Sequence, residues 1–204
     1  MKPVDPVVRH PHIKNPVETL ANTRHEFGEH GGVNMSVEAS TTFTAMHPDI
    51  LAEMFTGELG PDSGGCYLYG RHFNPTVYSL SRQLAALEDT ESAYCTASGM
   101  AAISGALLQL CNSGDHVVSS NTIYGGSYAL LNDFLPCKAG IHASLIDICD
   151  LDAVEAAITE RTRVIFAESI ANPTLRVANI PALADIAHRH DLKLVIDNTF
   201  ARYC

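Results

Sequence analysis

The sequence lacks the marks of several protein classes. Only 13 of its 204 residues are Lys or Arg, against 23 Asp or Glu, so its formal net charge is −10. No broad positive surface is available to contact a phosphate backbone, and nucleic acid is not expected as a partner. No window approaches the ~18 apolar residues of a membrane span, and the first residues lack the apolar run of a signal peptide. We therefore expect a soluble, cytoplasmic protein with no membrane partner.

Disulfide and metal frameworks are also poorly supported. The cysteines form no C-x-x-C pair, and several lie in apolar stretches, which favours reduced thiols in the core. The pairs His10 with His12 and His188 with His190 have no credible third ligand nearby, so no metal site is expected. The six cysteines are Cys66, Cys95, Cys111, Cys137, Cys149 and Cys204.

What is present suits a folded chain, because 46% of the residues are apolar and 18% are charged. Residues 1–62 hold six prolines and little periodicity, and we interpret them as an extended N-terminal arm before a domain that spans 63–204. Asn74 is a suitable helix cap and Pro75 suits the first helical turn. A helix is predicted there because apolar residues then recur at helical spacing, at Val77, Leu80, Leu84 and Leu87.

Farther along, short β-branched or aromatic runs alternate with longer helical patterns. Strands are expected at 92–96, 116–119, 142–147, 163–168 and 192–197. Helices are expected at about 99–111, 125–135, 151–159 and 181–190. Strands separated by helix-length crossovers pair in parallel, so the sequence predicts an α/β fold with a mostly parallel sheet and flanking helices.

Ligands of such a sheet collect at the carboxyl ends of its strands, where four segments stand out. The small residues 96–100 lead into a helix whose free N–H groups suit a phosphate, or they form only a helix cap. Tyr124 lies on a turn where its ring could stack on a heterocycle, or merely pack over a loop. Asn172 follows the fourth expected strand in a polar turn that could be no more than a turn. Asp197 ends an apolar strand two residues before Thr199 and requires a cationic partner.

Together these groups describe a site for a planar, phosphorylated and protonatable heterocycle, and pyridoxal 5′-phosphate fits that description. Nucleotide cofactors fit less well, because the sequence holds no G-x-G-x-x-G motif. Gly60 to Gly65 has the spacing of a P-loop, but Cys66 and Tyr67 follow where Lys and Ser or Thr would be required.

At these residues, from about Arg24 to Phe200, the chain resembles the Cys/Met-metabolism (transsulfuration) family of pyridoxal phosphate enzymes. Residues 69–76 resemble the family segment Y-S-R-x-x-N-P-T, with Gly70 in place of its Ser. The resemblance implies that Tyr69 and Arg71 reach the cofactor phosphate of a neighbouring subunit. It implies a cofactor contact for each of the following: Ser98, Gly99 and Met100 at the phosphate, Tyr124 on the ring, Asn172 near the ring hydroxyl, Asp197 at the pyridine nitrogen, and Thr199.

The resemblance also implies a fold and an activity. The fold is the first half of an aminotransferase-like (type I) large domain, in a homodimer or a dimer of dimers. Residues 24–36 look most like the methionine γ-lyase branch, which converts methionine to methanethiol, 2-oxobutanoate and ammonia. Tyr124 is then the expected catalytic residue, placed to move protons.

One departure accompanies the match. The chain ends at Cys204, before the Schiff-base lysine of the family, and Lys2, Lys14, Lys138 and Lys193 lie in no lysine motif of the family. We therefore expect a truncated chain without the family's activity by itself. Three alternatives stay open: a cystathionine γ-lyase or γ-synthase, a non-catalytic chain that pairs with full-length subunits, and a chain that forms no stable product.

Overall fold

The computed structural model describes residue 20 and residues 32–201, except 46, 62, 64, 65, 72 and 73. The chain forms two compact units that divide between Cys95 and Thr96. The predicted boundary near residue 62 stays a prediction. No helix in the described part is long and apolar enough to cross a membrane.

In the first unit, residues 75–87 form helix α3 (Pro75–Leu87), as the sequence predicts. The side chain of Asn74 caps it by accepting the N–H of Thr76, and Pro75 occupies its first turn. The segment interpreted as an extended arm also contains the helical turn η1 (Pro48–Ile50) and the short helix α2 (Leu51–Thr56).

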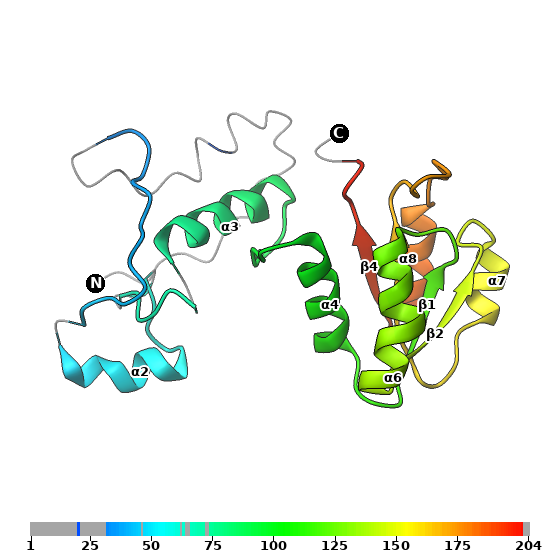
Figure 1. Ribbon diagram of the computed structural model, residues 1–204, viewed down its shortest axis with the longest axis horizontal. Helices are drawn as coiled ribbons and strands as arrows, with labels where there is room; N and C mark the ends of the chain where they lie inside the picture. The colour runs from blue at the N-terminus through cyan, green and yellow to red at the C-terminus, as the bar shows by residue number, and fades with distance from the viewer. Residues whose placement is uncertain are drawn as a thin grey trace. The chain divides into compact units, whose positions relative to one another are not determined.

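The second unit alternates helices and parallel strands (Figure 1). Its sheet has the order β2-β1-β3-β4, with every neighbouring pair parallel. The α/β class with a parallel sheet is therefore confirmed. The strands are β1 (His116–Ser120), β2 (His142–Ile146), β3 (Thr162–Glu168) and β4 (Lys193–Asp197). The helices are α4 (Gly99–Leu110), α5 (Gly125–Ala129), α6 (Leu135–Ala139), α7 (Leu151–Ala156) and α8 (Ile180–Arg189).

Two apolar layers cover the two faces of this sheet. On one face Val117, Val164 and Phe166 pack with residues of α4 and of the helical run from α5 to α6. On the other face Val118 and Ile165 pack with residues of α7 and α8. Because side chains alternate along a strand, the strand residues of the two layers come from alternating positions.

Two predicted elements differ from the structure. Residues 92–96 are not a strand, and among the described residues no neighbouring strand supplies the ladder that one needs. The helix expected at 125–135 extends to Ala139, with a π-helical segment, η2 (Leu130–Phe134), in its middle. Pro136 follows this wide segment and has no N–H to donate to the carbonyl four residues back.

The cysteines also divide differently from the expectation of core thiols. Cys111 is buried, and burial raises the pKa of its thiol. Cys66 and Cys95 are half-buried, whereas Cys137 and Cys149 are exposed. None of these five forms a disulfide, and Cys204 lies outside the described residues.

Candidate functional site

The candidate site lies at the carboxyl edge of the sheet in the second unit. Because the strands are parallel, β1, β3 and β4 all end at this edge, at Ser120, Glu168 and Asp197. The segments expected to hold a ligand follow these strand ends or begin α4. The structure therefore brings most of the predicted site residues to one edge.

The first turn of α4 presents free backbone donors. Ser98 caps the helix: its hydroxyl accepts the N–H of Ala101 at 3.1 Å, and its carbonyl accepts that of Ala102 at 3.1 Å. The N–H groups of Gly99 and Met100 have no acceptor among the described residues. Free N–H groups at the positive end of a helix dipole suit an anion.

Tyr124 lies beside this turn. It precedes α5, and its side chain is 50% exposed. A Cβ atom placed on Gly126 would lie 2.6 Å from Tyr124 Cε1 and 3.2 Å from Met100 Sδ. The ring and the first turn of α4 are therefore neighbours around a position where only glycine leaves them room.

Asn172 lies in the loop that follows β3. An antiparallel bridge between Ile170 and Val177 closes this loop, and the N–H of Ala171 donates to the carbonyl of Arg176 at 2.9 Å. The Asn172–Pro173 peptide bond is cis. The side-chain amide of Asn172 has no partner among the described residues, so it is available to a ligand.

Asp197 ends β4 and keeps one oxygen open. Its Oδ1 accepts the N–H of Thr199 at 3.0 Å and the hydroxyl of Thr199 at 2.5 Å. Its Oδ2 has no partner in the described part of the chain, and no ion pair of that part includes it. The cationic partner expected for this carboxylate is therefore not supplied by the described residues.

Glu168 is the site residue that the sequence interpretation missed. It ends β3 in register with Asp197 on β4, so the two carboxylates point to the same face of the sheet. This is the face on which α4, η2 and α6 pack, since Phe166 and Val195 precede Glu168 and Asp197 in the same rows and belong to that apolar layer. Glu168 could have been found by the argument applied to Asp197, because it too is a charge at the end of an apolar strand.

Glu168 also accepts two backbone hydrogen bonds from the neighbouring loops. Its Oε1 lies 2.6 Å from the N of Tyr124, and its Oε2 lies 3.0 Å from the N of Asn172. The residue is only 6% exposed. Two like charges on neighbouring strands create a negative potential at this edge, which favours a positively charged group beside Asp197.

Tyr69 and Arg71 belong to the first unit. The guanidinium carbon of Arg71 lies 5.3 Å from the centre of the Tyr69 ring, in a cation–π contact. Tyr69 forms an antiparallel bridge with Thr42, and the N–H of Gly70 donates to the carbonyl of Thr41 at 2.8 Å. Both predicted phosphate ligands are exposed, and their action across a subunit interface stays a prediction.

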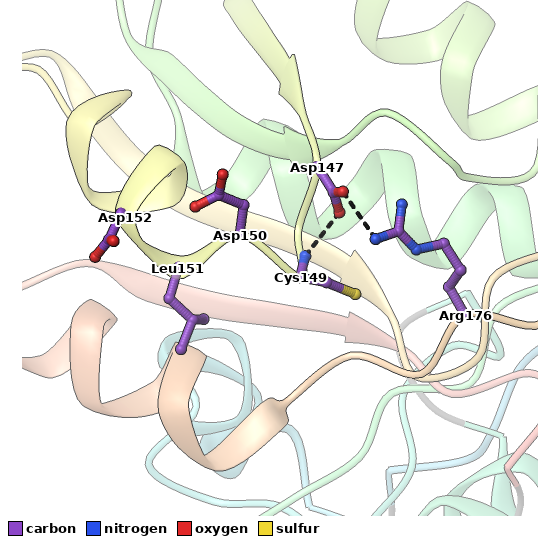
Figure 2. A pocket seen from close by; sticks show the side chains of 6 residues that line it. All are labelled: Asp147, Cys149, Asp150, Leu151, Asp152 and Arg176. Atoms are coloured by element: carbon purple, nitrogen blue, oxygen red, sulfur yellow. Dashed lines mark hydrogen bonds and ion pairs between the residues drawn. The ribbon is translucent and has the colours of Figure 1, made fainter.

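A separate shallow hollow of about 580 Å³ contains none of the predicted site residues (Figure 2). Asp147 accepts a hydrogen bond there from Arg176 at 2.8 Å and another from the N–H of Cys149 at 3.0 Å. The bond from Arg176 is the main reason why the pKa of Asp147 lies below its ordinary value. Asp150 accepts the N–H of Ala153 and so caps α7.

The described residues contain no group of three His, Cys, Asp or Glu side chains that could hold a metal ion.

The donor set at the carboxyl edge fits pyridoxal phosphate. Gly99 and Met100 offer N–H groups for the phosphate, and Tyr124 offers an exposed aromatic face. Asp197 offers an open carboxylate oxygen for a protonated ring nitrogen. Ser127, in the first turn of α5, also has a fully buried hydroxyl without a partner in the described structure.

Comparisons with known proteins agree with this reading. Methionine γ-lyase from Arabidopsis thaliana is 61% identical over 188 residues, which cover 92% of this chain and 42% of that protein. L-methionine γ-lyase from Pseudomonas putida is 39% identical over 173 residues, covering 84% of this chain and 42% of that protein. The chain thus spans less than half the length of these relatives.

A solved structure also resembles this chain. A crystal structure from Campylobacter jejuni, assigned as an O-acetylhomoserine (thiol)-lyase and holding a pyridoxyl-lysine phosphate, matches with a TM-score of 0.84 at 34% identity. The match covers 92% of this chain and 44% of that one. The family model described as Cys/Met metabolism PLP-dependent enzyme matches residues 18–202. The chain therefore belongs to the Cys/Met metabolism family of pyridoxal phosphate-dependent enzymes.

Proposed function

We propose that the chain supplies the cofactor-binding part of a carbon–sulfur lyase that acts on methionine and yields methanethiol, 2-oxobutanoate and ammonia. The observation that carries this substrate is the 61% identity with the Arabidopsis methionine γ-lyase over 92% of the chain. The arrangement of open polar groups at the carboxyl edge of the sheet supports the cofactor part of the proposal.

Each site residue has a stated task in this proposal. The N–H groups of Gly99 and Met100, with the cap residue Ser98, bind the phosphate. Asp197 accepts a hydrogen bond from the ring nitrogen and keeps it protonated, and Thr199 fixes the orientation of that carboxylate. Asn172 donates from its amide near the ring hydroxyl.

Tyr124 has two tasks, because its ring is exposed and lies next to the phosphate turn. The ring stacks on the bound heterocycle, and the phenol moves protons at the substrate carbons. When bound, pyridoxal phosphate supplies an electron sink that stabilises negative charge at those carbons. Tyr69 and Arg71 complete the phosphate site of a neighbouring subunit in this proposal.

A chimera tests the substrate. Residues 1–201 of this chain replace the corresponding part of the Arabidopsis enzyme, whose remaining part supplies the lysine and arginine that the family resemblance places outside these residues. We expect methanethiol and 2-oxobutanoate from methionine, and loss of both when Asp197 is replaced by Asn. Faster turnover of cystathionine than of methionine would contradict the methionine assignment and favour a cystathionine enzyme.

A binding experiment tests the cofactor site on the chain itself. The probe is pyridoxine 5′-phosphate, which has the ring and phosphate but no aldehyde and so forms no bond to surface lysines. We expect saturable binding by calorimetry. Borohydride reduction with pyridoxal phosphate is expected to leave no stoichiometric label on any one lysine. Absence of pyridoxine phosphate binding would contradict the proposal.

A mixing experiment tests the alternative of a non-catalytic chain. The chain could act only by pairing with full-length subunits through Tyr69 and Arg71. Co-expression with the Arabidopsis enzyme, followed by affinity capture of the chain, should then recover that enzyme and alter its turnover. Recovery that survives the double change Tyr69→Ala and Arg71→Ala would contradict a role of these residues in the pairing.

A further inference from the structure

Glu168 is a buried acidic side chain to which the proposed chemistry assigns no task. It continues the apolar row of Val164 and Phe166 on β3, and it is 6% exposed. A buried carboxylate is costly unless it is bonded, and among the described residues no cation pairs with it. Its stabilisation comes from two backbone N–H groups.

These two donors belong to the two loops that carry the ring contacts. Tyr124 lies 44 residues before Glu168 in the sequence and immediately precedes α5, whereas Asn172 lies 4 residues after Glu168 in the loop beyond β3. The distances from N to carboxylate oxygen are 2.6 Å for Tyr124 and 3.0 Å for Asn172. One oxygen serves each loop, so a single side chain ties both loops to the end of β3.

We propose that Glu168 is a positioning residue of the cofactor site, which holds the loops of Tyr124 and Asn172 in one mutual arrangement through its two carboxylate oxygens. This inference rests on the proposed function, because the arrangement matters for a ligand that contacts both residues. In this proposal Glu168 acts on that ligand through the two loops that it holds. It fixes the backbone positions from which the phenol ring of Tyr124 and the side-chain amide of Asn172 extend.

The chemistry of the two bonds makes the residue type specific. Both partners are N–H donors, so the group between them must accept on both sides. A carboxylate does so, whereas the amide of Gln has one oxygen and one NH₂ group of nearly the same shape. In Glu168→Gln one loop therefore faces a donor against its own donor, with little change in packing volume.

The first measurement needs no cofactor. Amide hydrogen exchange, resolved by residue, is compared in the unaltered chain, in Glu168→Gln and in the control Glu160→Gln, which changes an exposed Glu. Loss of one bond to a charged group should speed exchange at Tyr124 or Asn172 about tenfold to a hundredfold. The amides of β1 and β3 should keep their protection, as should all amides of the control.

The second measurement reads the position of the bound ring. Pyridoxine 5′-phosphate is titrated by calorimetry, and the induced circular dichroism of its ring is recorded. We expect Glu168→Gln to weaken binding about tenfold and to change the dichroism of the bound ring, while Glu160→Gln changes neither. Glu168→Asp keeps the charge on a shorter side chain. It should fall between the two, and it provides the same test if Glu168→Gln does not fold.

The outcomes separate this inference from the proposed function. Unaltered exchange at both amides in Glu168→Gln and Glu168→Asp would overturn the tether. Faster exchange together with unchanged affinity and dichroism would reduce Glu168 to a purely structural residue and would also overturn the inference. Failure of the unaltered chain to bind pyridoxine phosphate would instead overturn the proposed function, and the positioning role with it.

Discussion

At the amino edge of the sheet the polar side chains bond to one another. The ring of His116 on β1 lies 2.9 Å from Thr162 Oγ1 on β3 through Nδ1 and 2.9 Å from Ser144 Oγ on β2 through Nε2. Asp115, just before β1, accepts the N–H of Asn112 at 2.8 Å and pairs with Arg163 at 3.3 Å. This network joins three strands and leaves little bonding capacity for a ligand.

At the carboxyl edge several polar groups retain unused hydrogen-bonding capacity. In the described part of the chain, the N–H groups of Gly99 and Met100, one oxygen of Asp197 and the side-chain amide of Asn172 have no partner. Both carboxylate oxygens of Glu168 are bonded there, and their bonds hold two loops. We infer that the bonded polar groups of the amino edge, the closed edge, serve stability, and that the unbonded polar groups of the carboxyl edge, the open edge, serve binding. The predictions below separate these two effects.

Replacing Asp197 with Asn should have the largest effect, and the effect should be on binding. The change keeps the shape of the side chain but removes the charge that accepts the ring N–H of the ligand. A hydrogen bond between charged groups contributes up to about 3 kcal/mol, so affinity for pyridoxine 5′-phosphate should fall about a hundredfold. Calorimetry measures the affinity, and urea unfolding measures the stability.

The same change should leave the free energy of unfolding nearly constant, because Asp197 is in register with the like charge of Glu168. A large loss of stability in Asp197→Asn, with affinity maintained, would reverse the comparison between the two edges.

Thr162→Val should have the opposite effect, because it should lower stability and leave affinity for the ligand unchanged. Thr162 is 1% exposed, and its hydroxyl contacts the ring of His116, the N–H of Thr159 at 2.8 Å and the hydroxyl of Thr159 at 3.2 Å. Val has a similar shape but leaves buried polar groups without a partner, which costs about 2 kcal/mol in the free energy of unfolding. Urea unfolding measures this loss. The affinity for pyridoxine phosphate should not change, and a parallel fall in affinity would show that the edges are coupled.

The sequence predicts most of this architecture because the signals are local. Asn74 and Ser98 each accept an N–H in the first turn of a helix, and the alternation of strands and helices gives the parallel sheet. The rule that ligands collect at strand ends brings the loops of Tyr124, Asn172 and Asp197 to one edge. These parts need no knowledge of distant contacts.

The parts that were missed depend on contacts between distant residues. The tether of Glu168 joins residues 44 positions apart, which no local pattern reveals. The strand expected at 92–96 requires a neighbour that the described residues do not supply. Tyr94 there is 69% exposed, and Cys95 lies 3.2 Å from the hydroxyl of Ser81. The tasks that the resemblance implies for Tyr69 and Arg71 stay predictions.

Gly126→Ala should have an intermediate effect at the open edge. The new Cβ would lie 2.6 Å from Tyr124 Cε1 and 3.2 Å from Met100 Sδ, so the ring must swing away from the first turn of α4. We expect affinity for pyridoxine phosphate to fall about tenfold, the size of a lost aromatic stacking contact. The matched control is Gly105→Ala on α4, where a Cβ meets nothing within 4 Å. The control should gain about 0.5–1 kcal/mol in stability and lose no affinity. Equal affinities in the two variants would mean that the Tyr124 ring is not held beside the ligand.

His116 should give the smallest effect, visible as a pH dependence of the closed edge. Burial, followed by the charge of neighbouring His142, lowers the pKa of His116 below its ordinary value of 6.5. As pH falls below 6.5, the unfolded chain therefore binds a proton at this residue before the folded chain does. The stability that His116 contributes is present above pH 6.5 and is lost as pH falls toward the lower pKa of the folded state.

The measurement is the difference in slope between two proteins. The free energy of unfolding is followed across pH 5 to 8 for the unaltered chain and for His116→Gln, which can still bond to Thr162 and Ser144 but does not titrate. The other histidines are the same in both proteins, so the difference reports His116 together with its interaction with His142. We expect a steeper fall toward low pH in the unaltered chain, with no such difference in affinity for pyridoxine phosphate measured at pH 8. A steeper fall in His116→Gln would require a folded state that favours the protonated ring, and the network at the amino edge would then hold a charge rather than exclude one.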